Sequence, residues 1–515
     1  MKRKLQLTGI IIGGILVLVI GASFVLNPII EKRIVTTIYN ELPEHYSVND
    51  FELQINSLKG NASLHNLQIK IKNDLDSSKN STLILEKARF SGLSYVKLLF
   101  SDHIAFKTVS LSGVEIDYIQ PEKPEETEKK EASKPFEKTI SIQNFQLENS
   151  SFSIKNKEGK PIAALNISEL SLDKPKINAA TLSNKIPFEY QDVSLTAGEI
   201  SFQINPYDLL TVDQLALQNK QLALTDFAIK TIYSKAALSR VISKERDHFD
   251  LTVPQVVFED FLIEENTSGL NVNAQKLTFN NPEFYVYRDK LVADDTSIKP
   301  LYSKLLRELP FKLTINTAMI ENAQVEYEER VHADRAPGLV KFSNLNAEMQ
   351  NLSNTYAAGE KETAIDIQSK FMDESPLKLK WRFDINDTQD TFQVQGEIGR
   401  LNASKMNAFT VSNLNIETEG ELQKTYFNIN GNNNQSTVDF RIKYENFKVD
   451  ILTREQTRNR FLSAVVNIFV KKNTGSGDEQ FKETRAEVTR NKDRSAFNYL
   501  WINIEAGLKK TMIGI

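Results

Sequence analysis

The chain of 515 residues has no cysteine, so neither disulfides nor thiol chemistry contribute to its fold or activity. Histidine is scarce as well: the five histidines are scattered, without a carboxylate or second histidine at ligand spacing. A metal site would then need oxygen and histidine ligands, and no such cluster stands out. We therefore expect neither a metal nor another cofactor.

An excess of basic charge is also missing. Charged residues make up 25% of the chain and the formal net charge is −4. Nucleic-acid-binding domains carry a basic face, so we expect no nucleic-acid partner. Phosphate-loop, dinucleotide, nucleophile-elbow, metalloprotease and EF-hand motifs are all absent. A carboxylate pair assembled in space would leave no motif, but without any motif the prediction is that the protein is not an enzyme.

One long hydrophobic run is present, at the N-terminus. Lys2-Arg3-Lys4 precedes an uncharged apolar stretch from Leu5 to Leu26, and about 20 residues of helix span a bilayer core. The small residues Gly21-Ala22-Ser23 would suit a cleaved signal peptide, but the apolar run is longer than a signal peptide needs. We expect residues 1–27 to be a single-pass anchor, with the basic cluster in the cytoplasm and the bulk across the membrane.

Strand-like alternation dominates the middle of the chain. Between residues 377 and 385 every second side chain is apolar and the others are polar, which predicts a sheet with one apolar and one polar face. Shorter alternating stretches flank Ser112-Gly113, Asn149-Ser150 and Glu321-Asn322, and each predicts strand, turn, strand in a weak internal repeat. We expect roughly two dozen strands. Because helices are not interleaved, the pattern favours an antiparallel meander over a parallel α/β sheet.

Helical periodicity is confined to a few segments. It predicts an amphipathic helix from Ile29 to Leu42, short helices at 235–242 and 302–309, and a further helix from Phe461 to Phe469. The polar stretch 472–493 is predicted to be flexible.

A last amphipathic helix has an apolar face that either docks on a membrane or protein partner, with Trp501 as an aromatic anchor, or caps the sheet and hides its edge. The residues of this docking face are Phe497, Trp501, Ile504 and Leu508.

Residues 121–138 are rich in Pro, Glu and Lys and predict a charged, disordered loop. The predicted organisation has five parts. They are the anchor (1–27), an N-terminal helix with the first β segment (28–120), the charged loop (121–138), the main β segment (139–450) and the C-terminal amphipathic helices (451–515).

The apolar strand faces are the remaining candidates for a functional site. They form either a sealed core between two sheets or an open trough that shelters acyl chains, and alternation alone does not say what covers them. The candidate residues are Leu313, Ile315, Leu377, Leu379, Trp381, Phe383, Ile385, Phe427, Ile429, Val438, Phe440 and Ile442.

Several stretches in a fixed order carry a resemblance over nearly the whole chain. They are the anchor, Ile55–Ile69 with its Gly60 and Leu-His-Asn-Leu, Leu301–Pro310, Ile320–Glu329, Gly396–Asn402, and Phe497–Trp501 with Gly507–Lys510. Together they resemble the AsmA-like family of bacterial envelope proteins, especially uncharacterised members from Bacteroidetes-type bacteria.

The resemblance implies a long, curved antiparallel β-groove, taco-like, with an N-terminal transmembrane helix and C-terminal amphipathic helices. It implies a bacterial inner-membrane protein whose bulk lies in the periplasm and conveys phospholipids toward the outer membrane. It therefore favours the trough over the sealed core, and it brings no catalytic residues.

Two dozen strands about 4.8 Å apart reach about 110–120 Å, less than we expect of a periplasm, so an outer-membrane or periplasmic protein partner is expected too. The alternative is a structural adaptor with a closed β body and no lipid. If the apolar face is an open trough, replacing Trp381 and Phe383 by aspartate should block the passage of lipid while the sheet still forms.

Overall fold

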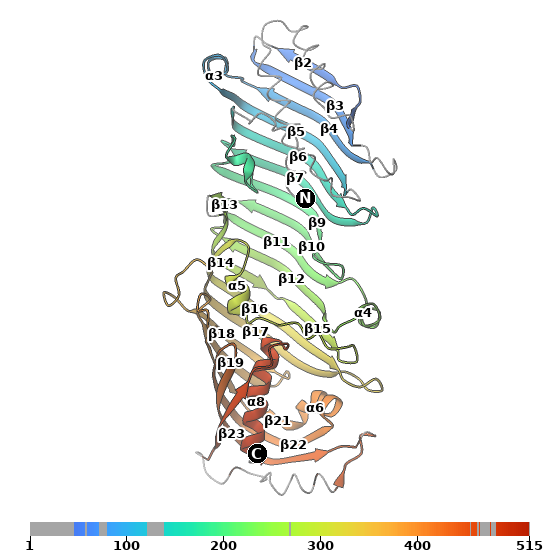
Figure 1. Cartoon of the computed structure of the whole chain (residues 1–515), viewed down its shortest axis with the longest axis vertical. Helices are drawn as coiled ribbons and strands as arrows, with labels where there is room; N and C mark the ends of the chain where they lie inside the picture. The colour runs from blue at the N-terminus through green and yellow to red at the C-terminus, as the bar shows by residue number, and fades with distance from the viewer. Residues whose placement is uncertain are drawn as a thin grey trace. The chain divides into compact units, whose positions relative to one another are not determined.

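The computed structural model describes residues 46–56, 59–71, 80–120, 138–266, 269–453, 455–460, 463, 474 and 480–513. Within them the chain is mainly β and mostly antiparallel, as predicted (Figure 1). The expected anchor and the helix at 29–42 lie outside the described residues, as do nearly all of the charged loop and of the helix at 461–469. No helix in the described part is long and apolar enough to cross a membrane.

The chain divides into two compact units, which we describe separately. Unit 1 comprises Met1–Thr225 with Glu264–Leu270, and unit 2 comprises Asp226–Ile263 with Asn271–Ile515. The elements of unit 1 are β1 (Tyr46–Val48), β2 (Glu52–Asn56), β3 (Asn61–Ile71), β4 (Ser81–Ser91), α3 (Tyr95–Phe100), β5 (His103–Ile119), β6 (Thr139–Lys155), β7 (Pro161–Asp173), β8 (Lys176–Ile177), η3 (Thr181–Ser183), β9 (Asp192–Gln203) and β10 (Asp208–Gln218).

Three strands cross the division between the units. They are β11 (Gln221–Thr231), β13 (Leu262–Asn266) and β14 (Gly269–Asn280). The elements of unit 2 are α4 (Lys235–Val241), β12 (Asp247–Glu259), β15 (Glu283–Asp289), α5 (Tyr302–Arg307), β16 (Lys312–Arg330), β17 (Gly338–Ser353), β18 (Thr363–Phe371), β19 (Ser375–Phe383), β20 (Phe392–Ile398), β21 (Leu401–Asn402), η4 (Ala403–Met406), α6 (Asn407–Leu414), β22 (Ile416–Gly431), β23 (Gln435–Ile451), β24 (Lys482–Thr489) and α8 (Ala496–Ile513).

Three of the predicted helices are confirmed: α4, α5 and α8 lie where the periodicity placed them. The helices α3 and α6 were not predicted, because they have only 6 and 8 residues, too few to establish a period. The prediction of a flexible stretch at 472–493 is wrong for β24, which pairs with β23 along its whole length. Its alternation of charged residues with Ala486 and Val488 is that of an edge strand.

The meander is not antiparallel throughout. In unit 1, β5 and β6 pair in parallel over their full length, from His103 with Thr139 to Ile119 with Lys155. In unit 2, β14 and β15 both pair in parallel with β16. Two consecutive strands can pair in parallel only if their connection runs back along the length of the first strand, so the connection must be long. This explains why the long charged segment follows β5 and why α5 lies between β15 and β16.

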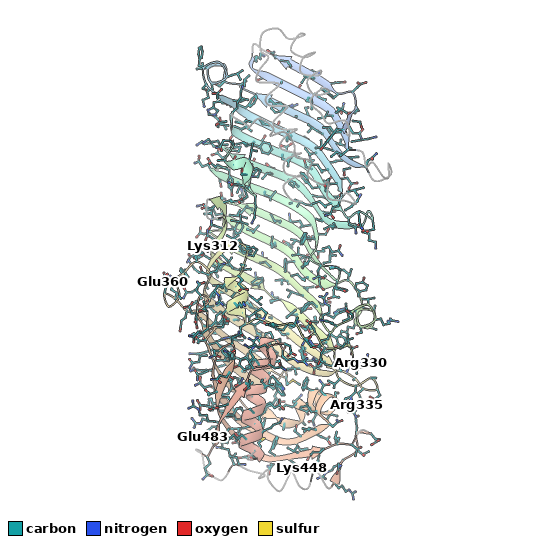
Figure 2. All side chains as sticks on the ribbon, in the orientation of Figure 1. Lys312, Arg330, Arg335, Glu360, Lys448 and Glu483 are labelled. Atoms are coloured by element: carbon teal, nitrogen blue, oxygen red, sulfur yellow. The ribbon has the colours of Figure 1, made fainter. Side chains whose placement is uncertain are left out.

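The predicted turns inside three strands are wrong. Gly113, Asn149 and Asn322 have positive φ values of 65°, 48° and 54°, but they lie within the continuous strands β5, β6 and β16. Figure 2 labels Lys312 and Arg330, which begin and end β16 on either side of Asn322. Asn and Gly tolerate the left-handed region, so one such residue can lie inside a strand without ending it. The pairing of β16 with β17 shifts register beside Asn322, as in a β-bulge, whereas the pairings around Gly113 and Asn149 keep their register.

The bulges of neighbouring strands lie side by side. The backbone N–H of Asn322 donates to Asn346 Oδ1 at 3.0 Å, and its Nδ2 donates to Asn281 Oδ1 at 2.9 Å. Asn281 has a positive φ of 48° at the junction of β14 and β15, and Asn344 has a φ of 50° in β17. Consecutive strands of unit 2 therefore bend along a shared line of asparagines.

Candidate functional site: the apolar face of the sheet

An unbroken row of apolar side chains crosses unit 2 from β12 to β24. Each member is the direct cross-strand partner of the next, so the row runs perpendicular to the strands. We call it the first apolar row, and its members are Phe258, Leu277, Ala318, Met349, Ile365, Trp381, Val394, Ile429, Val438 and Ala486.

A second apolar row runs beside the first on the same face, two residues further along each strand. A Cβ on Gly396 would lie 2.0 Å from Phe427 Cζ, so the glycine is the place where the Phe427 ring fits. The members are Val256, Phe279, Ile320, Ala347, Ile367, Leu379, Gly396, Phe427 and Phe440, after which Thr484 ends the row.

The opposite face of the same strands is polar. The row of cross-strand partners one residue away from the first apolar row contains a single apolar residue, and its members are Glu259, Lys276, Thr317, Gln350, Ala364, Arg382, Gln393, Asn430, Thr437 and Glu487. Because successive side chains of a strand point to opposite faces, unit 2 has one continuous apolar face, here called the apolar face, and one polar face.

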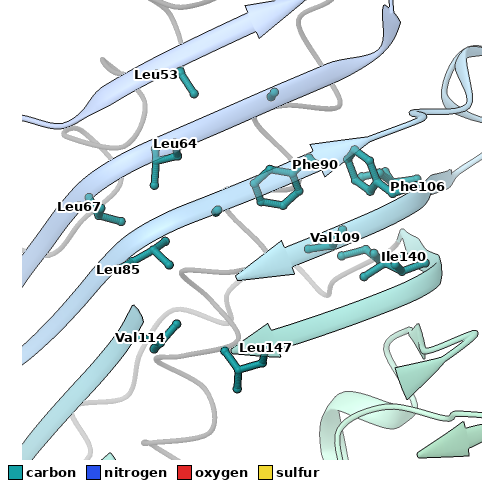
Figure 3. Packing of buried hydrophobic residues seen from close by; sticks show 14 of the residues in the cluster. Leu53, Leu64, Leu67, Leu85, Phe90, Phe106, Val109, Val114, Ile140 and Leu147 are labelled. Carbon is teal, nitrogen blue, oxygen red and sulfur yellow. The ribbon is translucent and has the colours of Figure 1, made fainter. Parts of the chain in front are cut away.

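Unit 1 has the same two-faced arrangement. One row, almost entirely leucine, crosses it from β2 to β10, and its members are Leu53, Leu64, Ala88, Leu111, Leu147, Leu170, Leu195 and Leu217. Figure 3 shows the packing around Leu53, Leu64 and Leu147, which are buried. Leu111, Leu170 and Leu195 are only partly buried.

Burial changes along the apolar face of unit 2. Met349, Ile365 and Ile367, on the central strands β17 and β18, are half-buried. Toward β23 the side chains are sealed: Ile429 and Phe440 are both 0% exposed. The face therefore has a partly open central part and a closed C-terminal part.

Helix α8 closes the C-terminal part. It packs on β22, β23 and β24 (Figure 1). Its Leu500, Ile504, Leu508 and Met512 join the cluster around Phe440. A Cβ on Gly507 would lie 2.6 Å from the Phe440 ring, so this glycine allows the helix to approach the sheet closely. Asn503, which is fully buried, accepts a hydrogen bond from Ser436 Oγ at 2.8 Å and fixes the position of the helix.

The segment between β15 and β16 covers the boundary between the open and closed parts. Its helix α5 places the Tyr302 ring against Trp381, with ring centroids 5.8 Å apart, and against Phe497 of α8 at 6.0 Å. Leu301 is buried in a small cluster with Ala496 and Tyr499. Burial, followed by the charge of Asp247, raises the pKa of Tyr302 to about 12, so its phenol stays neutral.

Ion pairs hold the chain that leads into α8. The Arg494 guanidinium donates to Asp294 at 2.6 Å and to the buried Glu245 at 3.0 Å. Lys290 also pairs with Glu245, at 2.7 Å. These contacts tie the start of α8 to the same β15–β16 connection that carries α5.

The predicted apolar residues lie as follows. Phe427, Ile429, Val438, Phe440 and Ile442 belong to the sealed cluster under α8, with Leu379 and Trp381 at its margin. Leu377 and Phe383 are buried in β19, whereas Leu313 and Ile315 lie in β16 opposite Val272 and Ala274. The alternation was predicted to reach Ile385, but β19 ends at Phe383 and Ile385 is buried in the turn that follows.

The four residues of the predicted docking face on the last helix have two different surroundings in the structure. Ile504 and Leu508 pack on the sheet, as the capping interpretation requires. Phe497 and Trp501 are 65% and 37% exposed, although each touches one aromatic ring, Tyr302 and Phe409 respectively.

Sequence reasoning missed the residues that decide which part of the face is covered. Leu500, Asn503 and Gly507 lie on the side of α8 that meets the sheet. The only sequence signal for this contact was Gly507, because a glycine inside a helical pattern often marks close packing. Tyr302 reaches Trp381 from a segment 79 positions away, for which the sequence carried no signal.

The chain matches no protein-family model and no curated protein. Within the described ranges, no group of three acidic or histidine side chains is placed to hold a metal ion.

Proposed function

We propose that the protein is anchored in a bacterial inner membrane by residues 1–27 and conveys phospholipids toward the outer membrane, with the acyl chains on the apolar face of its β units. The observation that carries the proposal is the first apolar row, which no charged side chain interrupts from β12 to β24.

A continuous row matters because of the energetics of transfer. Removing an acyl CH₂ group from water is worth about 0.8 kcal/mol, so a chain moving along a uniform apolar row meets no large barrier. A charged residue within the row would create such a barrier, since an ionised group next to hydrocarbon must be desolvated. The half-buried Met349, Ile365 and Ile367 leave apolar surface for such a chain.

The alternative of a closed structural adaptor is favoured by one observation, the cover of α8 over β22–β24. That cover leaves Met349, Ile365 and Ile367 half-buried, so it supports a closed end better than a closed body. Phe497 and Trp501 remain the residues with which α8 would meet a membrane or a protein partner.

The experiment that tests the proposal is mass spectrometry of lipids that copurify with the full-length chain. Aspartates at Trp381 and Phe383 are unsuitable, because Phe383 is buried and Trp381 packs on Tyr302, so the sheet itself would be destabilised. The double variant Ile365→Asp/Ile367→Asp places two charges on the half-buried part of the face. We expect it to retain less than about a fifth of the wild-type phospholipid, since each charge must be desolvated next to hydrocarbon.

The matched control is Ala364→Asp/Gln368→Asp, which adds the same two charges to the polar face of β18. It should retain lipid as the wild type does. A folded wild-type chain that carries no phospholipid, or equal losses in both variants, would contradict the proposal and leave the adaptor.

A further inference from the structure

A small pocket lies where the open part of the apolar face meets the closed part. It lies between β19, β20, α5 and α8, and its lining is almost entirely apolar. Its free volume is about 10 Å³, which is room for one water-sized group. Trp381, Tyr302 and Leu500 are among the lining residues, and Trp381 is also the member of the first apolar row that follows the half-buried Ile365.

The pocket has a hydrogen-bond donor without a partner. The Nε1 atom of Trp381 is buried, and no acceptor in the described part of the chain lies within hydrogen-bond reach. A buried N–H is nearly always paired, because an unpaired one has lost its hydrogen bonds to water without gaining another. Because Trp381 lines the pocket and its Nε1 has no partner within the described residues, an acceptor from outside the chain that fills the pocket would pair this donor.

The surrounding charges limit the kind of acceptor. Asp390 lines the pocket and is 3% exposed, and its carboxylate accepts from Ser303 Oγ and Arg307 Nη2, both at 2.9 Å. Arg307 already balances the charge of Asp390, so a free carboxylate would bring an unpaired second negative charge into an apolar site. An uncharged carbonyl oxygen brings none.

We propose that this pocket binds the ester carbonyl of a lipid acyl chain, which accepts a hydrogen bond from Trp381 Nε1, while the chain lies along the first apolar row toward Ile365 and Met349. This inference rests on the proposed function and adds to it the position at which the ester group of the lipid is held. The closed part of the face under α8 would then end the acyl path, and the polar end of the lipid would stop at Trp381.

Ether lipids provide the direct test, because they have the same chains and headgroup but no ester carbonyl. The full-length chain in detergent is equilibrated with equal amounts of diester and diether phosphatidylcholine, and the ratio of the two bound lipids is measured by mass spectrometry. The wild type should prefer the diester about fivefold, which corresponds to about 1 kcal/mol, the net worth of one hydrogen bond.

Trp381→Phe keeps an aromatic ring but removes the N–H, and it should bind both lipids in a ratio near one. Tyr426→Phe is the control, because it removes a donor from the polar face of β22, outside the pocket, and it should keep the wild-type ratio. The carbonyl site would be overturned, while lipid binding stands, by either of two results. One is a wild type without preference, which would mean that the site holds only water. The other is a Trp381→Phe protein that keeps the preference for the diester. Failure of both lipids to bind would instead overturn the proposed function.

Discussion

Single residues with left-handed backbone bend the strands of this protein. Asn149 and Asn322 combine a positive φ with a place inside a long strand, and Gly113 does the same with φ 65°. At Gly113 the backbone also lies close to the neighbouring strand, since a Cβ there would lie 2.6 Å from Glu86 Cβ. The bends therefore depend on particular residues that the pleated pattern itself does not require.

Gly113→Ala tests this dependence. The added methyl group meets both the unfavourable φ and the Glu86 side chain, so the variant should lose about 2–3 kcal/mol of stability and unfold at lower urea concentration. Gly159→Ala is the control, with φ 82° but no atom within 4 Å of the new Cβ. It should lose only about 1 kcal/mol. Equal losses would show that the approach of Gly113 to Glu86 does not matter.

At the level of elements, alternation predicted which side of a strand is apolar, because burial of one face imposes a period of two. It could not predict strand direction: the segment after Ile119 is equally compatible with a turn and with a return to a parallel partner. Asn149-Ser150 was interpreted as a turn because turns and left-handed positions inside strands favour the same residues. The cover over Trp381 was unpredictable, since Tyr302 and Leu500 reach it from distant segments.

The helix α8 is the element that divides the apolar face, and its contact depends on Gly507. Gly507→Leu would insert a large side chain where even a Cβ lies 2.6 Å from Phe440, so α8 should detach from β23. We expect its amide hydrogens to exchange at least about tenfold faster, measured by hydrogen–deuterium exchange. Lys509→Leu adds the same side chain at an exposed position and should leave exchange unchanged. Normal protection in Gly507→Leu would mean that α8 is held by other contacts, such as those of Arg494.

At the scale of the whole molecule, the two units share one design. Each has a row of direct cross-strand partners that is apolar throughout, ending at Leu217 in unit 1 and at Ala486 in unit 2. Each has half-buried members, such as Leu170 in unit 1 and Ile365 in unit 2. Lipid carriage by both units is the central claim.

Photo-crosslinking in living cells tests that claim most directly. A photoreactive amino acid is placed at Leu170 or Ile367 on the apolar faces, and at the adjacent Glu169 or Gln368 on the polar faces. We predict phospholipid adducts at 170 and 367 and none at 169 and 368. Folded proteins without adducts at 170 and 367, or with equal adducts at all four positions, would contradict the account.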